Sequence, residues 1–104
     1  MNTREQNIDL PMDQIRDFCR HNPIRRLSLF GSVLRDDFTE KSDVDFLVEL
    51  EPEARIGLFE FIRLQNQLED LTGKKADLRT AEDLHPRFRT RIVDEAELIY
   101  ERQD

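Results

Sequence analysis

The spacing of apolar positions predicts four strands in the chain. In residues 43–50 every second residue is apolar, which is typical of a strand buried on one face, and Leu47 joins the acidic residues on the other face. Its inward side chains are Val44, Phe46, Val48 and Leu50. Residues 24–30 end in an apolar run before Gly31 and predict a largely buried strand. Residues 76–79 and 98–100 predict a short third strand and an edge strand.

Helical spacing fills the segments between these strands. A helix over 56–71 would place one apolar stripe inward, and Gly73 follows it as a C-terminal cap. That stripe consists of Leu58, Phe61, Leu64, Leu68 and Leu71. An earlier helix is predicted with Asp9 as its cap and Pro11 in its first turn, ending before Pro23. Its inward residues are Met12, Ile15, Phe18 and Cys19.

The last part of the chain predicts a capped turn and a third helix. Thr80 is expected to cap a turn over 81–84, and a helix follows the interruption at Pro86. The apolar residues of this helix are Phe88, Ile92, Val93 and Ala96. The complete order predicts an α+β fold (an α/β sandwich), with a small mixed β-sheet and helices packed on one face. Residues 1–104 are expected to form one domain in which 1–9 are flexible.

Charge and composition restrict the function classes. The net charge of −7 disfavours direct nucleic-acid binding, which requires a basic surface, but it permits a nucleotide held through a divalent cation. The single cysteine, Cys19, cannot form an internal disulfide and is expected to be a buried thiol. With no apolar run of membrane length and no signal peptide, we expect a cytoplasmic protein that does not contact membranes.

The strongest chemical pattern is a set of three aspartates. Asp43 and Asp45 are two residues apart on a predicted strand, so their side chains share a face and their Cα atoms lie roughly 6.5–7 Å apart. An isolated pair of this kind is usually solvent-exposed. Here, however, acidic residues, which strands disfavour, interrupt an otherwise apolar strand. Asp77 lies alone in the short third strand. Carboxylates in this arrangement suit hard cations such as magnesium.

A Gly-Ser pair precedes the aspartates. Gly31 has no Cβ, so its backbone can bend sharply and approach a phosphate. Ser32 can donate its backbone N–H and its hydroxyl, and a helix that starts there would favour an anion. The pair alone is an ordinary turn. Its significance comes from the ten residues that separate it from Asp43.

Gly31-Ser32, ten residues and Asp43-Val44-Asp45 resemble the signature of the nucleotidyltransferase superfamily related to DNA polymerase β. The short chain resembles the minimal nucleotidyltransferases, specifically the MntA-like antitoxins encoded beside HEPN-domain toxins. This resemblance implies a polymerase-β-like nucleotidyltransferase fold. It also implies that Gly31 and Ser32 hold the triphosphate of ATP, that Asp43 and Asp45 bind two magnesium ions, and that Asp77 is the third catalytic and metal-binding carboxylate.

Two neighbouring features modify what the resemblance implies. Arg35 matches an arginine of the family that would contact a phosphate, or it would pair with Asp43 or Asp45. Asp36 and Asp37 stand where many relatives have a glycine. They would weaken nucleotide binding unless they point to solvent, which is what we expect of them.

The resemblance further implies a magnesium-dependent protein adenylyltransferase. It would transfer AMP from ATP to a hydroxyl of a partner HEPN ribonuclease toxin, a tyrosine by analogy, and would form a hetero-oligomer with that toxin. Two alternatives are an antitoxin that neutralises the toxin by binding alone, and transfer to a small-molecule acceptor. Arg87, Arg89 and Arg91 would form an exposed helix face or contact a partner.

Overall fold

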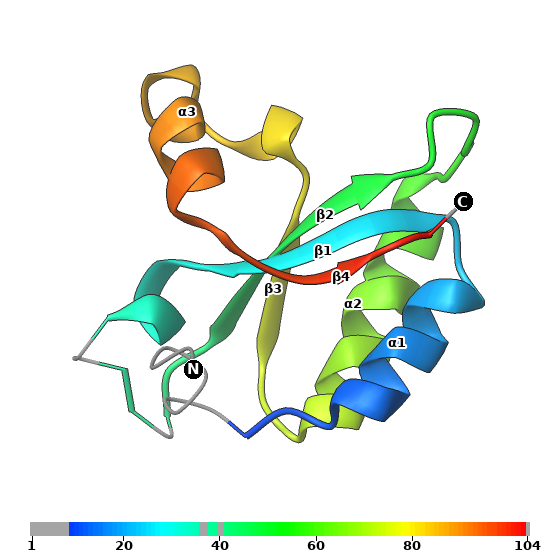
Figure 1. Ribbon diagram of the computed structural model, residues 1–104, viewed down its shortest axis with the longest axis horizontal. Coiled ribbons are helices and arrows are strands. Elements are labelled where there is room, and N and C mark those ends of the chain that lie inside the picture. The colour runs from blue at the N-terminus through cyan, green and yellow to red at the C-terminus, as the bar shows by residue number, and fades with distance from the viewer. Residues whose placement is uncertain (1–8, 36–37, 40, 104) are drawn as a thin grey trace.

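The computed structural model describes residues 9–35, 38–39 and 41–103, and its centre is a four-stranded mixed sheet (Figure 1). The strand order is β3-β2-β1-β4, in which β1 is antiparallel to both of its neighbours and β2 is parallel to β3. The strands are β1 (Ile24–Phe30), β2 (Val44–Leu50), β3 (Ala76–Arg79) and β4 (Glu97–Glu101). All four predicted strands are confirmed, with β4 at an edge.

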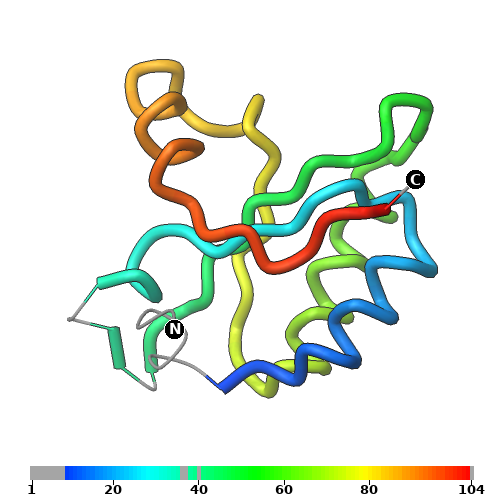
Figure 2. Tube along the Cα trace, in the orientation of Figure 1, coloured from blue at the N-terminus to red at the C-terminus, as the bar shows by residue number. Residues whose placement is uncertain are grey.

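Within the described residues, three α-helices accompany the sheet. Helices α1 (Met12–Arg20) and α2 (Leu58–Thr72) lie side by side on one face, as the sequence predicts. Helix α3 (Pro86–Glu95) stands across the strands from them (Figures 1 and 2). No residue of α3 is buried, so this helix contributes nothing to the main core. Of the helices that the structure describes, none is long and apolar enough to cross a membrane.

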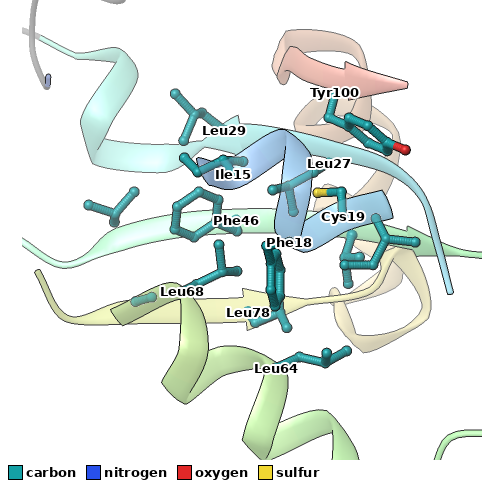
Figure 3. Packing of buried hydrophobic residues seen from close by; sticks show 14 of the residues in the cluster. Ile15, Phe18, Cys19, Leu27, Leu29, Phe46, Leu64, Leu68, Leu78 and Tyr100 are labelled. Carbon is teal, nitrogen blue, oxygen red and sulfur yellow. The ribbon is translucent and has the colours of Figure 1, made fainter. Parts of the chain in front are cut away.

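The core lies between the sheet and the α1–α2 layer. Leu27 and Leu29 of β1 and Phe46 of β2 are fully buried, and Figure 3 shows them packed with side chains from both helices. The predicted inward face of β2 is confirmed at 44, 46 and 48, which are buried while the residues between them are not, and Leu50 at the strand end is half-buried. Cys19 is buried as predicted, and this burial raises the pKa of its thiol to about 12.

Local signals fix most element ends. Gly73 caps α2 in the left-handed region with φ +71°, and Thr80 forms a capping box with Asp83 around the short 3-10 helix η3 (Ala81–Asp83). Both caps are confirmed. Asp9 is not the cap of α1, because Pro11 occupies that position without any side-chain hydrogen bond. The carbonyl of Pro11 accepts a hydrogen bond from the N–H of Ile15.

The start of α2 differs from the prediction. The helix begins at Leu58 rather than at residue 56, and Leu58 is 71% exposed. Leu64 and Leu68 of the predicted apolar stripe are buried, and Phe61 and Leu71 are partly buried and pack against the core. Leu58 is the member of the stripe that lies outside it. The segment 1–9 was predicted to be flexible, and of its residues only Asp9, which is exposed, lies within the described part of the chain. Asp36 and Asp37 also lie outside the described part.

Candidate active site

The chain turns sharply where β1 ends. Gly31 adopts φ +76° and starts the 3-10 helix η2 (Gly31–Leu34), which confirms a turn or short helix at this point. A Cβ built on Gly31 would overlap Oδ2 of Asp45 and lie 3.2 Å from its Cγ. The backbone N–H of Ser32 donates a hydrogen bond to the Asp45 carboxylate. Glycine is therefore required here both by the backbone conformation and by the carboxylate packed against it.

Strand register brings two of the predicted aspartates together. Asp45 pairs with Asp77 across the parallel β2–β3 ladder, and with Phe30 across the antiparallel β1–β2 ladder. Side chains alternate along a strand, so Asp45 points away from the face on which Phe46 is buried. Asp43 lies just before β2 and is exposed. The carboxylates therefore lie on the sheet face opposite α1 and α2.

The electrostatics of Asp45 reflect this crowding. Burial raises the pKa of the Asp45 carboxyl above its ordinary value, and the charges of Asp77 and then Asp43 raise it further. The Ser32 N–H and Arg79 act in the opposite direction. Arg79 donates from Nε to Oδ2 of Asp77 at 3.2 Å, so part of the local negative charge is already compensated.

The donor set suits a hard divalent cation, because carboxylate oxygens from two adjacent strands face the same side and repel one another. Within the residues that the structure describes, no three acidic, histidine or cysteine side chains are close enough to hold one metal ion together. The structure thus brings Asp45 beside Asp77 without gathering the predicted trio around one point.

A cavity of about 640 Å³ opens beside Asp45. This volume is within the usual range for small-molecule sites, about 300–1,000 Å³. One wall comes from the end of β1 and from η2, and the opposite wall is α3. The lining residues are Phe30, Gly31, Leu34, Arg35, Asp45, Phe88, Arg91, Ile92 and Glu95. In Figure 2 the turn after β1 and α3 lie on the same side of the trace.

The cavity changes the interpretation of α3. Phe88 and Ile92, which the sequence assigns to the apolar face of a packed helix, line the cavity instead, and Phe88 is 49% exposed. Sequence reasoning did not identify them as site residues. One signal was available: Arg91 and Glu95 fall on the same helical face, and two charges on an apolar stripe are unusual for a core helix.

The three arginines of α3 have different environments. Arg89 donates to the carbonyl oxygens of Ala81, Glu82 and Leu84 at 2.8, 3.3 and 3.1 Å, and so ties the helix to the segment before it. Arg91 lines the cavity and pairs with Glu95 at 3.5 Å. The guanidinium of Arg87 lies over the Phe88 ring, 5.9 Å from its centroid. They therefore do not act as one basic cluster.

Comparison with known families identifies the chain. The family model described as "Nucleotidyltransferase domain" matches residues 12–99, which include the whole sheet up to Ile99. The chain belongs to this family. Arg35, which follows η2, lies on the cavity wall of this nucleotidyltransferase together with Gly31.

Two relatives in sequence are protein adenylyltransferases by name. A Methanocaldococcus jannaschii protein, for which this activity is proposed, is 40% identical over 73 residues, or 70% of this chain and 76% of that protein. The protein adenylyltransferase MntA of Thermococcus cleftensis is 42% identical over 55 residues, or 53% of this chain and 54% of that protein.

Solved structures share the fold of the chain. A proposed minimal nucleotidyltransferase superimposes with a TM-score of 0.67 at 33% identity, covering 82% of this chain and 85% of that one. A toxin–antitoxin structure with AMP-PNP gives 0.71 at 19% identity, covering 90% and 76%. A tri-AMPylated Shewanella oneidensis HEPN toxin in complex with its MNT antitoxin gives 0.63 at 17% identity, covering 97% and 75%. The chain is thus an MntA-like minimal nucleotidyltransferase, and its predicted fold class is confirmed.

Proposed function

We propose that this nucleotidyltransferase is an antitoxin that transfers AMP from ATP to a hydroxyl, by analogy a tyrosine, of a HEPN-domain toxin with which it forms a complex. The observation that supports this most directly is the contact between Gly31 and Asp45, with Asp77 alongside, at the wall of a nucleotide-sized cavity. The adenylyltransferase names of its relatives supply the reaction class, and the AMPylated toxin in a related complex supplies the acceptor class.

The chain's own residues would divide the work as follows. Gly31 and Ser32 would bind the triphosphate through the turn after β1, where no Cβ intervenes. Arg35, on the same wall, would contact a phosphate oxygen. Asp43, Asp45 and Asp77 would hold two magnesium ions. When bound, such ions neutralise phosphate charge and lower the pKa of an attacking hydroxyl.

The transfer itself is an in-line displacement. The acceptor oxygen forms a bond to the α-phosphorus, the bond from that phosphorus to the bridging oxygen breaks, and pyrophosphate leaves. Asp77, which flanks Asp45 on the neighbouring strand, would accept the proton of the acceptor hydroxyl. The carboxylates contribute position and charge, and no covalent enzyme intermediate is required.

The position of the site also bears on one alternative, neutralisation by binding alone. An antitoxin that acts by binding alone gains nothing from a carboxylate pair whose charges repel on a sheet face.

We propose that residues 1–104 form one domain, since a single sheet joins strands from residue 24 to residue 101. We place its action in the cytoplasm, where ATP is available and the unpaired Cys19 remains reduced.

The test is an AMP-transfer assay with the HEPN-domain protein encoded beside this chain. That protein is incubated with ATP, magnesium chloride and either the wild-type chain, Asp45→Asn or Asp13→Asn, and its intact mass is measured. Asp13 is a matched control, because it is a fully exposed aspartate on α1 whose side chain contacts Arg16. We expect an adenylyl mass gain with the wild type and with Asp13→Asn, and none with Asp45→Asn.

Two results would favour the alternatives. An unmodified toxin whose ribonuclease activity is nevertheless suppressed would show neutralisation by binding alone. Adenylylation of compounds in an aminoglycoside panel, without any protein acceptor, would show a small-molecule transferase.

A further inference from the structure

One face of α3 lines the cavity. Phe88, Arg91, Ile92 and Glu95 follow the i, i+3, i+4, i+7 spacing of a single helical face, and all four line the cavity. An amphipathic helix normally buries such a face against a core, but α3 has no buried residue. Its apolar side chains therefore remain available to whatever enters the space between α3 and η2.

The ring of Phe88 is positioned by its neighbours. The Arg87 guanidinium lies over the ring at 5.9 Å from its centroid, and the His85 ring lies 5.9 Å away at 51°. Neither Arg87 nor His85 lines the cavity, whereas Phe88 does. The Phe88 ring thus contacts these two side chains and still remains half-exposed at the cavity.

The helix that presents this ring is also fixed in place. His85 caps the N-terminus of α3 by accepting from the Arg87 N–H at 3.1 Å. Arg89 anchors the same turn through its three bonds to carbonyl oxygens of the preceding segment. Polar contacts thus hold α3 in position although it lacks buried apolar residues, as a preformed binding wall requires.

The two walls of the cavity carry different groups, and each wall includes both charged and apolar side chains. Gly31 and Arg35 lie on the wall beside Asp45, where phosphates and cations would gather. The opposite wall presents the half-exposed ring of Phe88 and the side chain of Ile92, beside the ion pair of Arg91 and Glu95. A nucleoside triphosphate has a highly charged tail at one end and a planar ring at the other. Its tail matches the first wall and its ring matches the second.

We propose that Phe88, supported by Ile92, is the platform on which the nucleobase of the incoming nucleotide stacks, and that it determines nucleotide affinity separately from the phosphate-binding turn. This inference rests on the proposed function, since it assigns the base to the cavity that holds the transferred nucleotide. Stacking on an aromatic side chain changes affinity by roughly 5- to 150-fold per base.

The test separates the base from the phosphates. Binding of ATP and of inorganic tripolyphosphate, each with magnesium, is measured by titration calorimetry for the wild type, Phe88→Ala and Arg35→Gln. We expect Phe88→Ala to weaken ATP roughly 5- to 150-fold while leaving tripolyphosphate unchanged. Arg35→Gln should weaken both ligands. Unchanged tripolyphosphate binding also shows that the Phe88→Ala protein is folded.

Matched variants control for loss of an exposed aromatic or a charge. Phe59 is an 87% exposed phenylalanine on α2 that does not line the cavity, so Phe59→Ala should bind ATP as the wild type does. Arg63→Gln, also on α2 and away from the cavity, is the control for Arg35→Gln. Phe88→Tyr keeps the ring and should restore ATP affinity to within about twofold of the wild type.

The outcomes distinguish this inference from the proposed function. ATP binding that depends on Phe88, without AMP transfer to the toxin, supports the platform and refutes the proposed function. AMP transfer with normal ATP affinity in Phe88→Ala refutes the platform alone. If Phe88→Ala instead reduces binding of the toxin and leaves ATP affinity intact, the α3 face is a protein-docking surface. Equal loss of ATP and tripolyphosphate, or no binding of ATP by the wild type, also overturns the platform.

Discussion

Substituting Gly31 by alanine tests the geometry on which the site depends. Both Gly31 and Gly73 adopt left-handed backbone angles, with φ of +76° and +71°. A Cβ at Gly31 would overlap Oδ2 of Asp45, whereas a Cβ at Gly73 meets nothing within 4 Å. Gly73→Ala is therefore a matched control that introduces the same backbone strain without disturbing a carboxylate.

The expected costs differ by the contact with Asp45. An L-residue in the left-handed region costs about 1–2 kcal/mol, which both variants share. Gly31→Ala must also displace the Asp45 carboxylate and weaken its bond from the Ser32 N–H, adding about 1.5–3 kcal/mol. Gly73→Ala should thus lose about 1–2 kcal/mol of unfolding free energy and Gly31→Ala roughly 2.5–5 kcal/mol.

Urea denaturation measures these losses, and the AMP-transfer assay measures the effect on the site. Moving a positioned catalytic group by 1 Å can cost about 100-fold in rate, so Gly31→Ala should transfer AMP at least about 100-fold more slowly. Gly73→Ala should retain the wild-type rate at temperatures where it is folded. Equal rates for the two variants would refute the argument that Gly31 is required by its contact with Asp45.

Three further predictions concern charge, burial and the α3 wall. The pKa of the Asp45 carboxyl is raised above 3.8 in the folded protein, so folding favours the protonated carboxyl and the protein loses stability as pH rises. In EDTA, Asp45→Asn should therefore resist urea better than the wild type at pH 7. The two proteins should not differ below pH 3.8. The thiol of Cys19 has a pKa of about 12, against 9.0 for an exposed thiol, so it should resist iodoacetamide at pH 8 until urea unfolds the chain. Its burial should also lower the stability of the protein above pH 9, where the thiol ionises only in the unfolded chain. Labelling of the folded protein by iodoacetamide would contradict the burial of Cys19. Arg89→Ala removes three hydrogen bonds, so it should lower the unfolding free energy by roughly 1–3 kcal/mol and weaken ATP binding in calorimetry. Lower stability with unchanged ATP binding would show that α3 keeps its position without these hydrogen bonds.

The local sequence was sufficient for most of the fold. Alternation along β2 identified its buried face, and the apolar run before Gly31 identified β1, because a strand exposes successive side chains on opposite faces. Gly73 and Thr80 marked element ends through interactions that span only a few residues. The spacing of Gly31-Ser32 and Asp43-Val44-Asp45 indicated the family. These signals involve residues close together in the sequence, so they can be recognised without knowledge of the tertiary structure.

The tertiary structure decided how distant residues meet. Strand order and register, which depend on contacts between segments far apart in the sequence, placed Asp77 beside Asp45 and Gly31 against the same carboxylate. The sequence predicted helices packed on one face, which α1 and α2 are, but the place of α3 beside the cavity depends on tertiary contacts, because an apolar helical stripe suits a core and a ligand wall equally well. Only the packed structure shows that Phe88 and Ile92 face a cavity, and hence that the apolar face of α3 belongs to the site rather than to the core.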